Sequence, residues 1–139
     1  MANVNQIKNR IQPINMKRKE CQQIEQEHDA WQRSLAFRKQ ENALLKYRLS
    51  DMVDSYEGDH ALQTAEYFHN EFLLQDERIR RISGDLSAFL DQFGSLLPEM
   101  QLPENLLQAH EQLRADMLKF EQEFSMLSNS FNQRMASNA

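Results

Sequence analysis

Glycine, proline and cysteine are scarce in this sequence of 139 residues, which contains three, three and one of them, respectively. So few turn-forming residues exclude a β-sheet protein with many reversals and favour long helices. No apolar run exceeds three residues, so we expect no membrane-spanning segment and no secretory signal. Cys21 has no partner for an internal disulfide, which fits a reducing environment. We therefore expect one all-α domain with a cytoplasmic location.

What the sequence does contain is a heptad repeat of apolar residues in three segments, 14–56, 62–97 and 104–135. A period of 3.5 residues sustained over this length is typical of coiled-coil-like helix packing. The central positions of the repeat are Leu35, Leu45 and Leu49 in the first segment, Phe68, Phe72, Ile79, Ile82 and Phe89 in the second, and Leu113, Phe120, Phe124 and Phe131 in the third.

The breaks between the segments agree with the repeat. Gly58 is suited to end the first helix and Asp59 to cap the second, while Pro98 and Pro103 bracket the next connection. Short connections require antiparallel neighbours. The prediction is an elongated antiparallel three-helix bundle with coiled-coil-like heptad packing and helices at about 13–57, 60–97 and 103–135.

The two ends of the chain fall outside this bundle, which we assign to residues 13–135. Pro13 either begins the first helix or kinks a helix that starts near Val4, because proline lacks the amide hydrogen that a helix interior needs. We expect residues 1–12 to form a separate extension or short, bent helix. Residues 136–139 should fray.

The register of the repeat brings polar residues together inside the bundle. A turn centred between Gly58 and Asp59 places Asn42 opposite Gln75, with Phe124 closing the layer. A buried pair of amides commonly fixes register at some loss of stability. The alternative is that both amides turn to solvent.

The same register places His28, Phe89 and His110 in one layer. Two facing imidazoles either bind a metal ion, protonate together near pH 6, or serve as ordinary boundary residues. Glu25 and His28 have the Glu-x-x-His spacing of di-metal bundles, as do Glu66 and His69, but the two motifs lie roughly 30 Å apart along the rod. We therefore assign no metal ligands.

Several apolar residues lie outside the repeat, at about the same height along the rod. We expect them to form one exposed patch that serves as an interface, unless Val4, Ile7 and Ile11 cover it or it has no role. The interface candidates are Ala30, Phe37, Leu44 and Tyr47 of the first helix and Tyr67, Leu73 and Leu74 of the second.

The charge is divided unevenly along the chain. Residues 1–50 carry ten Lys and Arg against five Asp and Glu, and residues 51–139 carry six against sixteen. A basic first helix against two acidic helices favours the intended pairing. The basic clusters Lys17-Arg18-Lys19 and Arg78-Ile-Arg80-Arg81 are too short to indicate nucleic-acid binding, and Pro13 interrupts the only amphipathic segment suited to a membrane surface.

No catalytic arrangement, phosphate-binding loop or cofactor motif accompanies the repeat. We therefore predict a non-catalytic interaction or scaffold protein without cofactors. Its partner is another protein or a second copy, giving a homo-oligomer of which a dimer is the simplest form. The alternative prediction is a metal-binding or pH-responsive bundle centred on His28 and His110.

Overall fold

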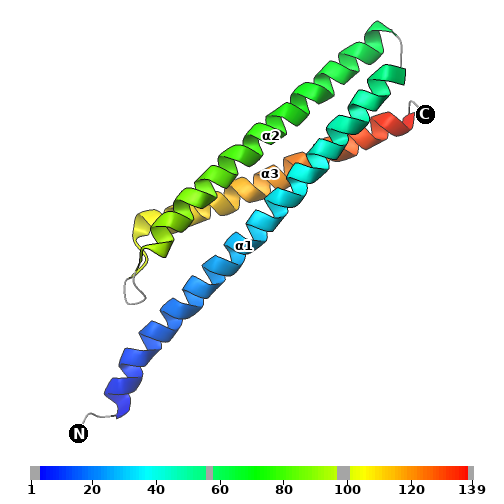
Figure 1. The fold of residues 1–139 in the computed structure, drawn as a ribbon. Coiled ribbons are helices and arrows are strands. Elements are labelled where there is room, and N and C mark those ends of the chain that lie inside the picture. The colour runs from blue at the N-terminus through cyan, green and yellow to red at the C-terminus, as the bar shows by residue number, and fades with distance from the viewer. Residues whose placement is uncertain (1–3, 56–57, 97–100, 138–139) are drawn as a thin grey trace.

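The computed structural model of the chain consists of three long helices (Figure 1). It describes residues 4–55, 58–96 and 101–137, with residues 4–18 and 59 described by their backbone alone. Helix α1 spans Val4–Ser55, α2 spans Asp59–Gly94 and α3 spans Glu104–Ser137. Helix α2 runs antiparallel to α1 and α3 and packs against both. The predicted all-α, antiparallel three-helix bundle is confirmed.

Gly58 makes the turn from α1 to α2. Its φ of +125° is a conformation that residues with a Cβ rarely adopt. Its carbonyl accepts a hydrogen bond from the amide of Leu62 at 3.2 Å, so Gly58 itself is the N-cap of α2. The prediction that Asp59 caps this helix is wrong, because the helical path already begins at Asp59.

The ends of the other connection lie close to the predicted positions. Helix α2 ends at Gly94, before the predicted end at residue 97, and the amide of Ser95 closes its last turn on the carbonyl of Gln92 at 3.3 Å. The carbonyl of Pro103 accepts the first helical bonds of α3 at 3.0 and 3.1 Å. Glu104 follows in the first turn, where a negative charge favours the helix.

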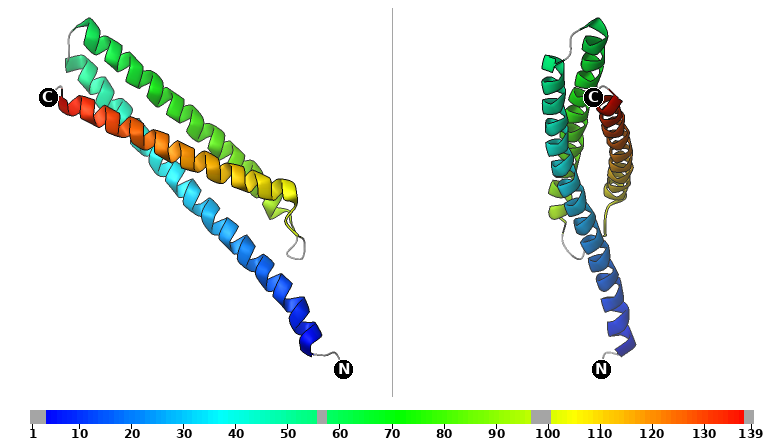
Figure 2. Two further views of the ribbon diagram at one scale, coloured as in Figure 1. Left: turned by 180° about the vertical axis from the view of Figure 1, so that it is seen from behind. Right: turned by 90° about the vertical axis from the view of Figure 1, so that its right-hand side faces the viewer.

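Helix α1 begins well before the predicted residue 13, since its backbone is helical from Val4 onward. The sequence predicted a bend or a separate segment upstream of Pro13. Proline has a backbone φ that fits a helix, and it removes only the one hydrogen bond to the carbonyl four residues earlier. This part of α1 projects beyond the end of α2 and the start of α3 (Figures 1 and 2). The carbonyl that loses its hydrogen bond to Pro13 therefore does not have to be buried against a neighbouring helix.

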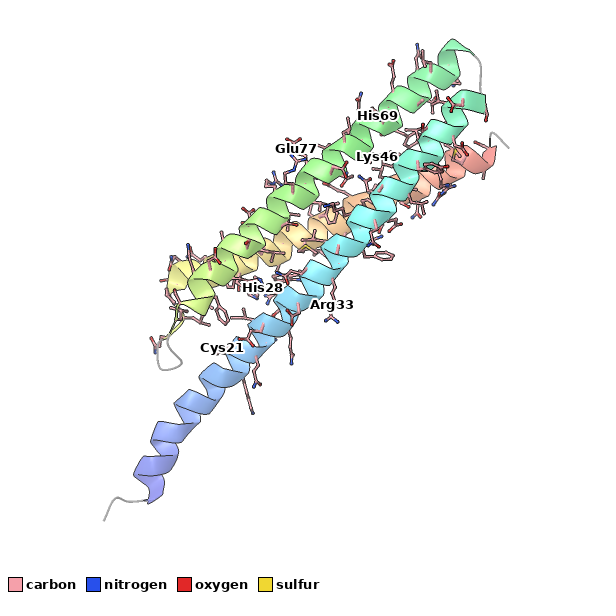
Figure 3. All side chains as sticks on the ribbon, in the orientation of Figure 1. Cys21, His28, Arg33, Lys46, His69 and Glu77 are labelled. Atoms are coloured by element: carbon pink, nitrogen blue, oxygen red, sulfur yellow. The ribbon has the colours of Figure 1, made fainter. Side chains whose placement is uncertain are left out.

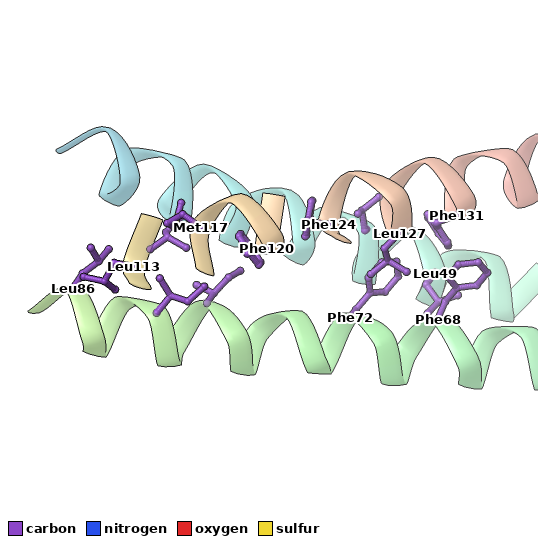
Figure 4. Packing of buried hydrophobic residues seen from close by; sticks show 14 of the residues in the cluster. Leu49, Phe68, Phe72, Leu86, Leu113, Met117, Phe120, Phe124, Leu127 and Phe131 are labelled. Carbon is purple, nitrogen blue, oxygen red and sulfur yellow. The ribbon is translucent and has the colours of Figure 1, made fainter. Parts of the chain in front are cut away.

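The core follows the predicted repeat along the whole bundle (Figure 4). Phe72, Phe124 and Phe131 are fully buried. Phe131 of α3 meets both Phe68 and Phe72 of α2 edge-on, with ring centroids 5.2 Å apart in each pair. Such edge-to-face pairs add to the stabilisation from apolar burial. Large aromatic side chains therefore fill the seam between α2 and α3.

Polar contacts between the parallel helices α1 and α3 show that their register is constant. The sequence separation of the bonded residues changes only from 82 to 84 along this part of the bundle. The pairs are His28 with His110, Arg38 with Glu121, and Arg48 with Asn132. This alignment places residues of the predicted layers at the same height.

None of the helices, over the residues that the structure describes, combines the length and the apolarity needed to cross a membrane.

Candidate functional site

His28 and His110 meet inside the bundle, as the register predicts. Nε2 of His28 lies 3.1 Å from Nδ1 of His110, and the side chains are 1% and 4% exposed. The ring of Phe89 stacks on His28 with centroids 4.4 Å apart, and Trp31 lies against both imidazoles at 5.0 and 5.2 Å. The contact between the two imidazoles is thus enclosed by aromatic rings from α1 and α2.

The surroundings of His28 favour its neutral form. Its pKa is lowered from 6.5 to about 4, mainly by burial and also by the neighbouring His110, while Glu27 and Asp29 act in the opposite direction. Nδ1 of His28 is buried without a hydrogen-bond partner, so protonation would create an unpaired buried N–H. Joint protonation of both imidazoles near pH 6, one of the three alternatives that the sequence left open, is therefore disfavoured for His28 in the folded state.

The outer edge of His110 borders an ion pair. Its Nε2 lies 3.5 Å from Oε1 of Glu27 and 3.4 Å from Nη2 of Arg114. Arg114 in turn donates to both carboxylate oxygens of Glu27 at 2.9 Å. The pair joins α1 to α3 beside the histidine layer and separates His110 from solvent.

The histidine layer offers too few ligands for a metal site. Among the residues whose side chains are described, no group of three His, Cys, Asp or Glu is placed to hold a metal ion. Glu25 is exposed while His28 points into the core, and His69 lies far from His28 toward the other end of the rod (Figure 3). Burial raises the pKa of the Cys21 thiol, and Glu25 and Glu20 raise it further, which disfavours a thiolate.

Asn42 makes a polar contact in the middle of the bundle, but with different partners from those predicted. Its amide group donates to the carbonyl of Phe72 at 2.9 Å and to Oδ1 of Asp76 at 2.8 Å. Lys46 donates to the other oxygen of Asp76 at 2.5 Å. The expected bond between Asn42 and Gln75 is replaced because the neighbouring carboxylate is a stronger acceptor than an amide.

The amides of Asn42 and Gln75 are both inside the bundle. Their side chains are 0% and 2% exposed, so the alternative that they turn to solvent is also wrong. Among the residues that the structure describes, Oδ1 of Asn42 and Oε1 of Gln75 have no hydrogen-bond partner. Two acceptors cannot satisfy each other, and this layer is therefore only partly hydrogen-bonded.

Arg38 links α1 to α3. It donates to Oε2 of Glu121 at 2.6 and 2.9 Å and to Glu41 on its own helix at 2.8 Å, and the bond to Glu121 raises its pKa. The hydroxyl of Ser34 donates to the other oxygen of Glu121 at 2.5 Å. Glu123, two residues farther along α3, pairs with Arg78, because it lies on the flank of α3 that faces α2.

All seven interface candidates predicted from the sequence are exposed. Apart from Ala30, the exposed fraction of their side chains runs from 38% to 69%. The structure does not gather them into one patch, however. Tyr67 and Leu74 line two open grooves between α2 and α3. Phe37 of α1 lies elsewhere. Its ring is 5.9 Å from the guanidinium of Arg38, and this guanidinium bonds to the flank of α3 that faces α1.

The interface candidates are separated because residues at the same height along two helices can lie on different sides of the bundle. The proposed cover by Val4, Ile7 and Ile11 concerns side chains outside the described residues. The continuous backbone of α1 carries these positions beyond the bundle and away from Phe37.

Sequence reasoning missed several further exposed apolar side chains. They are Val53, Leu62, Leu107, Leu118 and Met126. Each lies outside the seam positions of the repeat, so the same search that found Phe37 would have found them if applied to all three helices. Exposed apolar surface is thus spread along the rod.

Comparison of the chain with protein-family models, characterised proteins and solved structures found no match.

Proposed function

We propose that this protein is a non-catalytic interaction or scaffold module that associates with itself through its exposed apolar side chains. The observation that carries the proposal is the contrast between a filled interior and an apolar exterior. Large side chains such as Phe72, Phe120 and Phe124 fill the seam, whereas Leu62, Leu118 and Met126 are more than half exposed. Exposed apolar residues on a rigid scaffold favour association with other surfaces.

The polar groups support a role in assembly of the bundle itself. His28 bonds to His110, Asn42 to Asp76 and Arg38 to Glu121, so each joins two helices. An enzyme needs a pocket with several converging polar groups. The lone Cys21 fits a reducing compartment, and we place the protein in the cytoplasm.

Sedimentation velocity over a range of protein concentrations tests the proposal. We expect a species with the mass of two chains at micromolar concentration, which dissociates on dilution. A single-chain mass at every concentration would contradict self-association.

A second candidate is a pH-responsive bundle, favoured by the buried contact between His28 and His110. Melting and sedimentation at pH 8 and near pH 4, together with metal analysis of the purified protein, separate it from the first, because the pKa of His28 in the folded chain is about 4. A bound metal ion, or release of a second copy between these two pH values, would support the histidine layer as the functional site. Unchanged assembly without metal would contradict it.

A further inference from the structure

The two ends of the rod carry opposite charge. Residues 1–19 contain five Lys and Arg and no Asp or Glu, while residues 51–77 contain eight Asp and Glu and no Lys or Arg. We name residues 4–19 the basic tip and residues 51–77 the acidic hairpin. The tip is the part of α1 that projects past α2 and α3, and the hairpin surrounds the turn at the opposite end (Figures 1 and 2).

The acidic hairpin remains acidic after its basic neighbours are counted. Lys46, Arg48 and Arg134 also lie at this end, but the six acidic residues of the hairpin whose side chains are described outnumber these three basic ones. Asp51, Asp54 and Glu66, among others, are exposed. Within the described part of the chain, none of these three forms an ion pair, so their charge is available to another molecule.

Apolar side chains accompany this charge on the flank where α1 meets α2. Lys46 and Asp76 bond to each other across this flank. Val53 lies two helical turns from Lys46, and Leu62 lies about four turns from Asp76, so both share the flank. Val53 and Leu62 are 37% and 54% exposed. The acidic hairpin therefore combines negative charge with exposed apolar surface.

The basic tip has the complementary sequence pattern. Ile7 and Ile14 occupy the repeat position that His28 and Leu35 occupy farther along α1, and Val4 and Ile11 adjoin them. The heptad position that is buried within the bundle is thus also apolar in the segment of α1 that α2 and α3 do not reach. The same stretch of sequence carries Lys8, Arg10, Lys17 and Lys19 at other positions of the repeat. An isolated helix of this length is only marginally stable, so it favours a partner.

We propose that the occupant is a second copy of this chain, with two rods antiparallel and the basic tip of each packed on the acidic hairpin of the other. This inference rests on the proposed self-association and specifies its surfaces. A tip cannot reach its own hairpin, because α1 is one continuous helix of 52 residues and about 78 Å. Packing tip against tip would bring like charges together.

The antiparallel arrangement also predicts that association stops at two chains. A two-fold axis makes both contacts between tip and hairpin at once, using the same surfaces on both copies. Head-to-tail stacking makes one such contact per junction and continues into a filament. The closed dimer therefore pairs two basic tips with two acidic hairpins at one interface, whereas each junction of a filament pairs one.

A charge exchange tests this arrangement. The tip variant carries Lys17→Glu, Arg18→Glu and Lys19→Glu, and the hairpin variant carries Asp54→Lys and Glu66→Lys. Each variant alone should dimerise about a hundredfold more weakly than the unmodified chain at low salt, because attraction becomes repulsion. An equimolar mixture should regain the mass of two chains, since both contacts are again between opposite charges. Simple misfolding cannot produce this rescue.

The matched control is Arg80→Glu with Arg81→Glu, which reverses an exposed basic pair elsewhere on α2 and should leave dimerisation unchanged. Failure of the mixture to dimerise, while the unmodified chain does, would overturn the antiparallel arrangement and leave self-association standing. An unmodified chain that is monomeric throughout would overturn both. A filament, or a monomer whose tip binds anionic phospholipid vesicles or duplex DNA instead, would overturn the antiparallel dimer.

Discussion

Asn42 of α1 donates a hydrogen bond to the carboxylate of Asp76 on α2, with 2.8 Å between Nδ2 and Oδ1. Lys46, one turn along α1, holds the other oxygen of the same carboxylate. The amide and the ammonium thus fix one point of α2 against α1. The layer remains incompletely bonded, because the side-chain oxygens of Asn42 and Gln75 are buried without partners. Partly satisfied buried polar layers stabilise a fold less than apolar layers do.

Replacing both amides, Asn42→Leu with Gln75→Leu, should raise the free energy of unfolding by about 1–2 kcal/mol. The change removes two unpaired acceptors and adds apolar surface to the core. The carbonyl of Phe72 keeps its helical partner, and Asp76 keeps Lys46. Urea denaturation measures the effect. Asn42→Ala is the control: it leaves a cavity and should destabilise the bundle. A double leucine variant less stable than the unmodified chain would show that the amides stabilise the fold.

The histidine layer makes stability depend on pH in a defined window. The folded pKa of His28, about 4, is below its ordinary value of 6.5. Between these values the unfolded chain binds a proton that the folded chain does not, so stability falls as pH falls. The contribution of His28 is complete above pH 6.5 and decreases by about 3 kcal/mol as pH approaches 4. Urea denaturation at several pH values measures this slope.

His28→Phe isolates that contribution, because phenylalanine stacks on Phe89 and cannot titrate. We expect its unfolding free energy to change less between pH 6.5 and pH 4 than that of the unmodified chain. The control is His69→Gln, which removes an exposed imidazole on α2 and should keep the original slope. Equal slopes for the His28 variant and the unmodified chain would contradict the buried neutral state.

Arg38 should contribute more to stability than its place near the surface suggests. It bonds Glu121 of α3 and lies 5.0 Å from the ring centroid of Phe124. Arg38→Ala should lower the unfolding free energy by about 1–2 kcal/mol, since it removes a charge-assisted bond and packing together. Arg33→Ala is the matched control, because within the described part of the chain Arg33 bonds only the carbonyl of Asp29 on its own helix. Equal effects in thermal or urea denaturation would contradict the role of Arg38.

The heptad repeat was sufficient to predict the core and its layers. Leu35, Phe72 and Phe124 lie where the repeat placed them, because apolar burial and short connections leave little freedom to the register. The partners of Asn42 and Arg38 were not predictable in the same way. In each case several acidic residues lie within one helical turn, and the choice depends on which flank of the neighbouring helix each one occupies.

Exposed features were predicted less well than buried ones. Every interface candidate is exposed, yet height along the rod did not reveal that Phe37 and Leu74 lie on different sides. For Pro13 the sequence left two alternatives open, and the helix that starts near Val4 is the one found, although a separate or bent extension was expected. Proline only disfavours a helix interior, and a projecting segment tolerates one missing hydrogen bond.

The side on which two chains meet can be tested with two matched substitutions, Leu62→Asp and Phe37→Asp. Both replace an apolar side chain that is more than half exposed, 54% for Leu62 and 62% for Phe37. Leu62 lies on the flank between α1 and α2 that the basic tip is proposed to cover, whereas Phe37 lies on the flank toward α3. Leu62→Asp should weaken dimerisation by about tenfold or more, because it buries an added charge beside acidic residues.

Phe37→Asp should leave the dimer intact, with sedimentation velocity as the measurement for both variants and circular dichroism to confirm that each is folded. If Phe37→Asp loses the dimer and Leu62→Asp keeps it, the interface lies on the flank between α1 and α3. That result would remove the acidic hairpin as the docking surface and retain self-association, because the same experiment would show that the unmodified chain is dimeric.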